Sequence, residues 1–242
     1  MNAGRNYRLY TGYRRYSELK QLDWIVRNVE FHKANRQAHS ITILDIGCGK
    51  GNISLPLASL GYQIHGIDLD PNEISYVAER NEFPNASFEV GDAENIDFEN
   101  QCDIVICSAI IEHLSFPENL LRKLREIVKK DGVILITIPN GYGPYELFYQ
   151  TPMRLLSRLS SLFGSPNTSA DPHIHKHNFS FKTFSTLMGD HSLYIEKVEH
   201  SDFMSFWPIV RRVDFLVRID CKVADVLPHS LVSGWHFVCR LK

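Results

Sequence analysis

Asp45-Ile46-Gly47-Cys48-Gly49-Lys50-Gly51 ends the strand-like run ITILDI and leads into a segment of helical character that begins at Asn52. Its glycines occupy alternate positions, and glycine lets a backbone turn sharply and approach a ligand closely. A strand, a glycine turn and a helix in this order open a βαβ unit, from which parallel sheets are built. The stretch therefore predicts an α/β fold with a ligand at the carboxyl end of its first strand.

The spacing of the glycines indicates which ligand is expected. Dinucleotide-binding loops read G-x-G-x-x-G and aim helix N–H groups at a pyrophosphate, whereas this loop reads G-x-G-x-G. Asp45 would repel a pyrophosphate but attract a ligand ammonium group. The loop thus favours a ligand with an amino acid moiety. A nicotinamide-dependent oxidoreductase and a glycine turn without a ligand remain alternatives.

The flanking residues continue the alternation of strand and helix for about a hundred residues. Asp70 is expected to cap a helix that begins at Pro71, and Ser115 with Glu118 has the spacing of a capping box at the next helix. Further strands are expected at YQIHGID, ASFEV, CDIVICSA, residues 132–138, LYIEKVEHSDF and WHFVCRL. With the first run they predict a seven-stranded mixed sheet with helices on both faces.

The remaining segments are expected to be additions to this sheet. Residues 1–40 are predicted to form a helical N-terminal segment, because apolar residues recur at helical spacing from Tyr16 onward. Residues 41–242 form the predicted α/β domain. Helical cap insertions are expected within it at about 144–190 and 207–228.

Two more acidic side chains fall at the expected carboxyl edge of the sheet. Asp68 ends the second strand, where a carboxylate can accept from both hydroxyls of a ribose, and a plain turn residue is the alternative. Asp92 follows the third strand and can accept from an adenine amino group, although Gly-Asp is common in turns.

With these motifs in register, residues 41–140 resemble the class I S-adenosylmethionine-dependent methyltransferases. The branch in question includes the ubiquinone-biosynthesis O-methyltransferases and many small-molecule methyltransferases. The resemblance implies a Rossmann-like fold, S-adenosylmethionine as cofactor, S-adenosylhomocysteine as product and a small-molecule methyl acceptor. The cofactor residues that it implies are Asp45, Gly47, Cys48, Gly49 and Gly51 at the methionine part, Asp68 at the ribose, Leu69, Asp92 and Ala93 at the adenine, and Ser108 and Ala109 beside the sulfonium.

The same branch commonly carries a Glu-His pair after the fourth strand, here Glu112-His113. Methyl transfer is an in-line displacement at an activated sulfonium, so a base is needed only when the acceptor is a hydroxyl. A neutral histidine can take that proton. His113 is therefore the candidate catalytic residue, and a histidine that braces the following helix is the alternative.

Candidate acceptor contacts are scattered over the chain. The turn after the fifth strand carries Asn140, Tyr142 and Glu146 toward the expected acceptor cleft, with a plain loop as the alternative. His177 matches a position where the family often has a histidine ahead of a helix. Tyr13 belongs to the tyrosines that recur every third residue from Tyr7, which predict either a lid or an aromatic face packed on the domain.

A histidine-rich segment raises the question of a metal. His173, His175 and His177 alternate, so they share one face of an extended segment. No acidic residue or cysteine accompanies them at a typical ligand spacing, so no metal is expected, with a site on these histidines as the alternative.

Composition narrows the remaining classes. A formal net charge of −2 over 242 residues gives no basic field for nucleic acid. The N-terminus lacks the apolar core of a signal peptide and no run is long enough to cross a bilayer, which predicts a cytoplasmic protein without a membrane span. The five scattered cysteines predict reduced, packed thiols.

The function expected from these features is S-adenosylmethionine-dependent O-methylation of a small molecule by a monomer or homodimer. The acceptor classes considered are a sugar, a glycan precursor and a phenolic metabolite. The ending Ser233-Gly234-Trp235-His236-Phe237 is similar to that of bacterial methyltransferases of glycan and cell-envelope biosynthesis. A catalytically inactive cofactor-binding regulator or partner protein is the alternative.

Overall fold

The computed structural model describes residues 6–96, 98, 100–153 and 175–242. Within them seven strands form one sheet in the order β3-β2-β1-β4-β5-β7-β6. The strands are β1 (Thr42–Ile46), β2 (Gln63–Asp68), β3 (Ala86–Val90), β4 (Cys102–Ser108), β5 (Val128–Pro139), β6 (Leu193–His200) and β7 (Gly234–Leu241). β7 runs antiparallel between β5 and β6, and the strands from β3 to β5 are parallel. The predicted seven-stranded mixed sheet is confirmed.

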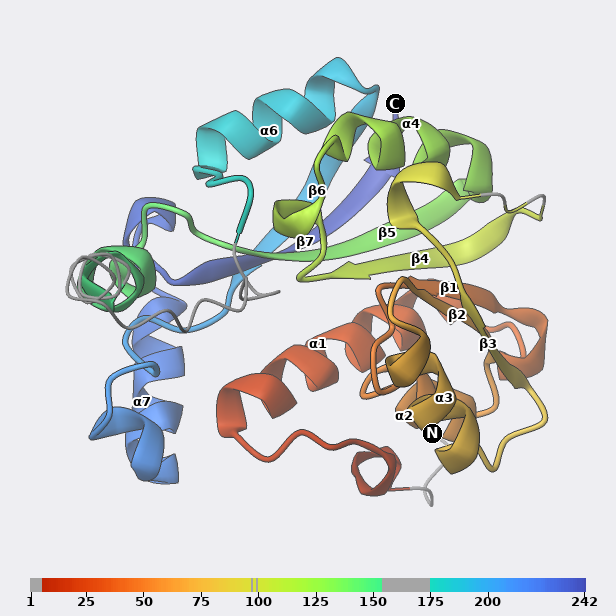
Figure 1. Cartoon of the computed structure of the whole chain (residues 1–242), viewed down its shortest axis with the longest axis horizontal. Helices are drawn as coiled ribbons and strands as arrows, with labels where there is room; N and C mark the ends of the chain where they lie inside the picture. Colours follow the sequence, from red (N-terminus) through yellow and green to blue (C-terminus); the bar gives the residue numbers. More distant parts are fainter. Residues whose placement is uncertain (1–5, 97, 99, 154–174) are drawn as a thin grey trace, which may run out of the picture.

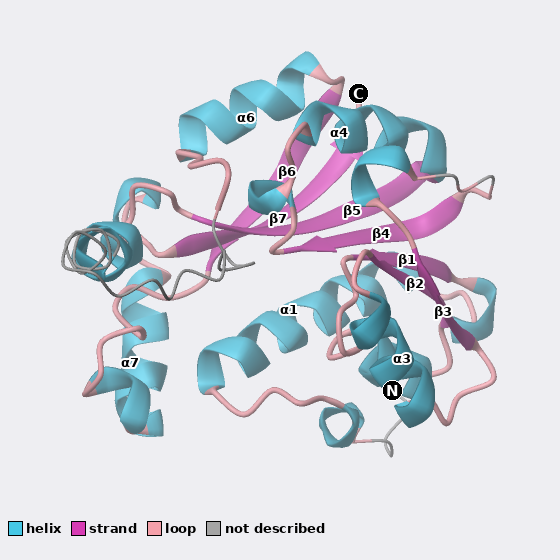
Figure 2. Cartoon of the chain, in the orientation of Figure 1, coloured by secondary structure: helices cyan, strands magenta, loops and turns pink. Residues whose placement is uncertain are grey.

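Helices cover both faces of the sheet, as Figures 1 and 2 show. One face carries α1 (Tyr16–Lys33), α2 (Ser54–Ser59) and α3 (Pro71–Arg80), and the other carries α4 (Pro117–Ile127) and α6 (Phe181–Asp190). α7 (Asp214–Ala224) lies beside α1. Short helical turns are η1 (Tyr7–Tyr10), η2 (Ala38–Ser40), η3 (Ala93–Asn95), η4 (Ile111–His113), η5 (Glu146–Gln150), η6 (Val210–Arg212) and η7 (His229–Leu231). No helix among the described residues is both long and apolar enough to span a bilayer.

Alternate side chains of the central strands fill a separate core on each face of the sheet. In β4, Val105 and Cys107 pack in the core that contains α4, whereas Ile104 and Ile106 pack in the core that contains α1. Successive side chains of a strand point to opposite faces, so a strand covered on both sides must be apolar throughout. This requirement explains why the run CDIVICSA is almost continuously apolar.

α1 is part of the second core and not a separate unit. Its residues Leu22, Ile25 and Val29 are fully buried against the sheet. Residues on both sides of the sequence boundary at residue 40 therefore belong to one hydrophobic core. Tyr10 packs edge-on against Phe83 with ring centroids 4.9 Å apart, so the N-terminal tyrosines lie on the domain as a packed aromatic face.

The helix starts show which local signals hold. Asp70 accepts a hydrogen bond from the Asn72 N–H at 2.8 Å at the start of α3, as its spacing predicts. The capping box at α4 is wrong: the carboxylate of Glu94, from η3, accepts from the backbone N–H groups of Ser115 and Phe116. A distant side chain satisfies this helix start better than the local one does.

Other expectations are confirmed with small shifts. The five cysteines are free and buried, and α6 and the two late strands lie where the sequence predicts them. β5 begins earlier than residue 132, at Val128. Residues 154–174 of the expected cap insertion, His173 among them, lie outside the described residues.

Candidate active site

The carboxyl ends of β1 and β4 meet where the strand order reverses, which is the place where open α/β sheets bind ligands. The loop after β1 turns through Gly47, Gly49 and Gly51, all with positive φ, at +75°, +47° and +73°. A Cβ at Gly51 would lie 2.4 Å from a methyl of Val77, and one at Gly47 would lie 2.6 Å from Ile110. A Cβ at Gly49 would meet nothing closer than Asp68 at 4.0 Å. Packing therefore requires two of the glycines, while Gly49 leaves open space for a ligand.

Asp68 stands at the edge of this open space. One of its carboxylate oxygens accepts from the Gly49 N–H at 2.8 Å and the other from the Asp70 N–H at 3.0 Å. Each oxygen keeps a lone pair for a further donor. The carboxylate is thus fixed at the end of β2 in the orientation needed to accept from two neighbouring hydroxyls.

Asp45 is the buried acidic group of the site, with 1% of its surface exposed. Its Oδ2 accepts from the Ser54 hydroxyl at 2.5 Å, whereas Oδ1 has no hydrogen-bond partner among the described residues. Burial, and secondarily the charge of Asp68, raise the pKa of Asp45 to about 6, although the Ser54 hydrogen bond opposes the rise. A buried carboxylate oxygen without a partner among the described residues can accept from a further donor, such as an ammonium group.

The residues expected at the adenine lie further along the same edge. Asp92 accepts from the Glu94 N–H at 2.9 Å and so caps η3, with Ala93 buried behind it. Leu69 presents 70% of its side chain to the surface. Cys48 is buried beneath the loop, so its backbone and not its thiol is available to a ligand.

Ser108 and Ala109 close the edge at the end of β4. Ala109 has a positive φ of +51°, unusual for a residue with a Cβ, and its N–H donates to the Thr137 carbonyl at 2.9 Å. The Ser108 hydroxyl accepts from the Gln21 amide at 2.6 Å. α1 is thereby attached to the end of β4, next to the place expected for the sulfonium.

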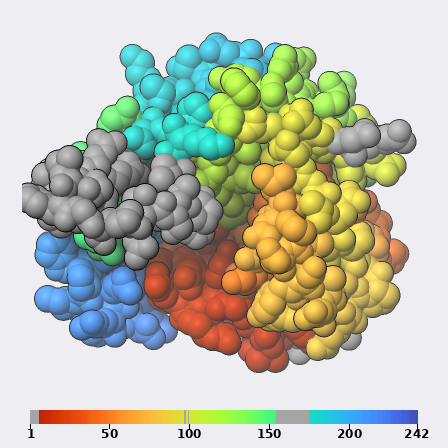
Figure 3. All heavy atoms as spheres, viewed as in Figure 1, coloured from red at the N-terminus to blue at the C-terminus, as the bar shows by residue number. Residues whose placement is uncertain are grey.

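The N-terminal segment crosses the glycine loop. The Gly12 N–H donates to Oδ1 of Asn52 at 2.8 Å, and Thr11 is buried. Figure 3 shows this red segment directly against the orange and yellow atoms that follow β1. Burial, and then the charges of Asp45 and Glu18, raise the pKa of Tyr13. Tyr13 packs against the core that contains α1 and is not among the described residues that line the cavity described next.

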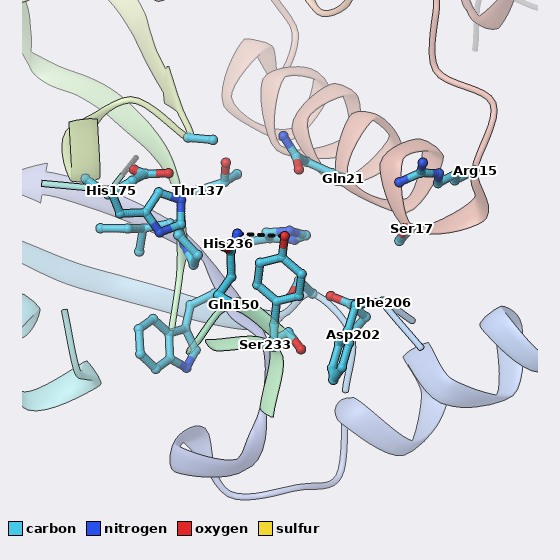
Figure 4. Close-up of a pocket in the computed structure, with 18 of the residues that line it drawn as sticks. Arg15, Ser17, Gln21, Thr137, Gln150, His175, Asp202, Phe206, Ser233 and His236 are labelled. Atoms are coloured by element: carbon cyan, nitrogen blue, oxygen red, sulfur yellow. Dashed lines mark hydrogen bonds between the residues drawn. The ribbon is translucent and has the colours of Figure 1, made fainter. Parts of the chain in front are cut away.

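A cavity of about 450 Å³ opens beyond Ala109, between α1 and the ends of β5 and β7. Figure 4 shows side chains from α1 on one side and His175 and Thr137 on another. Its polar lining includes Gln21, Thr137, Gln150, Asp202, Ser233 and His236. The Gln150 amide donates to the Tyr145 hydroxyl at 2.9 Å. The cavity is open to solvent, and segments from Arg15 to His236 line it.

Glu112, His113 and His175 form a polar cluster in the cavity wall. Nε2 of His113 lies 3.8 Å from Oε1 of Glu112, and the rings of His113 and His175 meet edge to face at 5.1 Å. Burial raises the pKa of Glu112 to about 7, against the opposing effects of its own backbone N–H and of His175. His113 thus lies in the cavity wall, and its catalytic role stays a prediction.

Backbone hydrogen bonds hold the two parts of the cluster together. The N–H groups of Lys176 and His177 both donate to the Glu112 carbonyl, at 2.9 and 3.1 Å. Nδ1 of His175 lies 3.0 Å from Oε1 of Glu146, whose side chain is buried. Glu146 is not among the described residues that line the cavity, and His175 connects it to the cavity wall.

Three expected acceptor contacts do not line the cavity. Asn140 is buried and its amide donates to the Val232 carbonyl at 2.9 Å, while its Oδ1 accepts from the Tyr142 N–H at 3.1 Å. The side chain of Tyr142 is 59% exposed. Nε2 of His177 lies 3.3 Å from the Ser115 carbonyl. The amide of Asn140 is needed to hold its own turn, so it is not available to an acceptor.

His236 is a cavity residue that the sequence pattern does not reveal. Burial first, and then the charges of Lys20 and Arg27, lower its pKa to about 3, which keeps the ring neutral. Its Nδ1 has no hydrogen-bond partner among the described residues. Within WHFVCRL it reads as one polar residue of a buried strand, and only the pairing of β7 with β5 brings it into the cavity.

Comparison with known proteins gives matches over much of the chain. A family model described as a methyltransferase domain matches residues 37–189. A ubiquinone biosynthesis O-methyltransferase of Rickettsia akari is 30% identical over 124 residues, which are 50% of this chain and 48% of the relative. One of Rhodopseudomonas palustris is 27% identical over 167 residues, 64% of this chain and 66% of the relative. The chain spans about half the length of the first curated relatives that it matches.

Solved structures extend the likeness to nearly the full fold. The magnesium protoporphyrin IX methyltransferase of Synechocystis, solved with bound S-adenosylhomocysteine, superposes with a TM-score of 0.57 at 15% identity. The alignment covers 93% of this chain and 84% of that one. At this identity the likeness concerns the fold alone.

Proposed function

Because this chain belongs to the class I S-adenosylmethionine-dependent methyltransferase family, we propose that it transfers the cofactor's methyl group to a hydroxyl of a small molecule. The acceptor classes that we propose are a sugar, a glycan precursor or a phenolic metabolite. The observation that carries the proposal is the open space at Gly49, bordered by the carboxylate of Asp68, together with the polar cavity that Ala109 lines. The names of the curated relatives support oxygen as the accepting atom.

The cofactor supplies a methyl group already activated on a sulfonium, so the protein's task is mainly alignment. In our proposal Asp45 binds the methionine ammonium, Asp68 accepts from the ribose hydroxyls and Leu69 covers the adenine. Ala109, whose backbone is fixed by Thr137, forms the border between this site and the cavity. The acceptor then meets the methyl group at that border.

His113 is the group that we propose takes the proton of the acceptor hydroxyl. It lines the cavity, and a carboxylate oxygen of Glu112 lies 3.8 Å from its Nε2. A buried carboxylate at this distance stabilises the histidine once it carries a positive charge. The neutral ring of His236, on β7, also lines the cavity and is our candidate for orienting the acceptor.

Calorimetry with S-adenosylhomocysteine and mass spectrometry of a labelled-methyl screen test the proposal. Asp68→Ala should lower the affinity for S-adenosylhomocysteine about 10- to 100-fold, because two ribose hydroxyls lose a charged acceptor. Asp131→Ala, an exposed carboxylate at the far end of the sheet, is the matched control and should leave the affinity unchanged. Absence of S-adenosylhomocysteine binding would sink the proposal. Binding without methyl transfer to any acceptor would favour the inactive regulator instead.

A further inference from the structure

We propose that Glu112, His113 and His175 bind a divalent transition metal ion in the wall of the acceptor cavity. The three residues each offer one ligand atom, and these atoms lie within 4.8 Å of one another. Two imidazoles and a carboxylate are a donor set that Zn²⁺, Fe²⁺ and Co²⁺ accept in proteins. The sequence hides the set, because His175 is distant in the chain from Glu112 and His113 and follows a different strand.

The separation of the ligand atoms suits such an ion. Ligand atoms about 2.1 Å from a tetrahedral ion lie about 3.4 Å from each other. Nε2 of His113 and Oε1 of Glu112 are 3.8 Å apart, and the three ligand atoms lie within 4.8 Å of one another, so the set reaches this geometry by contractions from a few tenths of an ångström up to about 1.4 Å. Such a shift is within the reach of side-chain rotation.

Glu146 supplies the outer partner that metal-binding histidines require. A histidine that ligates a metal through one nitrogen almost always donates its other N–H to a carboxylate or carbonyl, which fixes the ring. Nδ1 of His175 lies 3.0 Å from Oε1 of Glu146, which leaves Nε2 for the ion. The side chain of Glu146 is almost fully buried, and its hydrogen bond with His175 helps to satisfy this buried carboxylate.

The burial of Glu112 points to a cation as well. Its side chain is 2% exposed, and Oε2 has no hydrogen-bond partner among the described residues. An unpaired buried carboxylate oxygen costs several kcal/mol unless a proton or a cation meets it. Of the described residues that line the cavity, Arg15 is the one lysine or arginine, and no ion pair with Glu112 is recorded for it. A divalent ion would balance both buried carboxylates.

The site is held in place before any ion arrives. The backbone N–H groups of Lys176 and His177 donate to the Glu112 carbonyl, which joins the segment of His175 to η4. Lys176 also donates from Nζ to the Ser115 hydroxyl at 2.8 Å. Ligands fixed by backbone bonds lose little conformational entropy on binding.

Three protein ligands leave a coordination position open toward the cavity. An ion there would lower the pKa of an acceptor hydroxyl that reaches it, and His113 would then serve as a ligand and not as the base. This chemical role rests on the proposed function, whereas metal binding itself does not.

The test uses full-length protein without a histidine tag, treated with a chelator and dialysed. Titration calorimetry with Zn²⁺ should give one tight site, and Co²⁺ should give the visible absorption bands of a site with nitrogen and oxygen ligands. His175→Ala and Glu112→Gln should each lower the affinity for Zn²⁺ at least 100-fold and abolish the absorption bands of bound Co²⁺. Glu146→Gln should lower the affinity for Zn²⁺ about 10- to 100-fold and leave the absorption bands of bound Co²⁺ in place. His177→Ala, two residues from His175 but outside the cluster, should change neither.

S-adenosylhomocysteine calorimetry on the same samples separates the two proposals. If it binds normally while Zn²⁺ and Co²⁺ show no site, or bind the His175→Ala and wild-type proteins alike, the metal proposal is wrong and the methyltransferase proposal stands. If Zn²⁺ binds as expected while S-adenosylhomocysteine does not bind, the reverse holds. A variant that retains S-adenosylhomocysteine binding is folded, so its loss of Zn²⁺ reports on the ligand set.

Discussion

Asp45 shows at the scale of one residue how a binding site costs stability. The carboxylate is buried with one oxygen unpartnered, and its pKa of about 6 lies above the ordinary 3.8. Each pKa unit corresponds to about 1.4 kcal/mol, so the ionised form destabilises the ligand-free protein by about 3 kcal/mol. We therefore predict that Asp45→Asn raises the free energy of unfolding at pH 7, in urea titrations without ligand, by about 1–3 kcal/mol.

The sign of this effect fixes its pH dependence. A carboxyl group whose pKa is raised on folding stabilises the protein while protonated, and that stability is lost as the pH rises from about 4 through 6. The difference between Asp45→Asn and wild type should thus be near zero at pH 4 and grow toward pH 7. Affinity for S-adenosylhomocysteine should move the opposite way, falling in the wild type below pH 6 and staying weak in the variant. A wild type more stable than Asp45→Asn at pH 7 would contradict this account.

Individual residues also mark the limit of sequence reasoning at the site. The glycine loop, Asp68 and Ala109 lie at strand ends as the sequence predicts, because local turns position them, while their roles toward the cofactor stay predictions. Asn140 and His177 were less predictable, because their polar atoms are used by the Val232 and Ser115 carbonyls, which belong to other segments.

The glycine loop is the element in which folding and binding can be separated. Gly51→Ala places a methyl 2.4 Å from Val77, in a left-handed conformation, and should lower the free energy of unfolding by about 2–4 kcal/mol. Gly49→Ala places its methyl in open space and should cost only about 1 kcal/mol of stability. Gly49→Ala should instead lower the affinity for S-adenosylhomocysteine at least tenfold, because the added methyl occupies the space in which the ligand would lie against the loop. Urea unfolding and calorimetry on both variants check this, and equal losses of stability would refute it.

Elements were predictable where their ends are determined locally. Asp70 and Pro71 define the start of α3 within four residues of sequence. α4 begins instead directly after Ser115 and Phe116, whose N–H groups donate to Glu94 of η3, and no local pattern contains that contact. Strands were more predictable than helix caps, because a strand that is buried on both faces is a continuous apolar run in the sequence.

At the scale of the whole molecule, the sequence predicts the sheet but not what surrounds the cavity. The sheet follows from repeated local units. The cavity unites α1, the ends of β5 and β7 and the segment at His175, which meet only through tertiary packing. The cluster of Glu112, His113 and His175 was unpredictable for the same reason, since spacing rules detect metal ligands only within a segment.

The place of α1 in the core yields the last prediction, and it decides between a lid and a structural helix. Leu22, Trp24, Ile25 and Val29 of α1 are at most 1% exposed. Burial of such side chains contributes about 2 kcal/mol each, together about 8 kcal/mol, against a total stability of about 5–15 kcal/mol for a domain. Deletion of residues 1–36, which keeps all of the matched family domain, should therefore abolish the cooperative thermal transition in circular dichroism and the binding of S-adenosylhomocysteine. Deletion of residues 1–10 keeps α1 and the Gly12 contact with Asn52, so that protein should still unfold cooperatively. A cooperative, ligand-binding protein after the longer deletion would show that α1 is a dispensable lid.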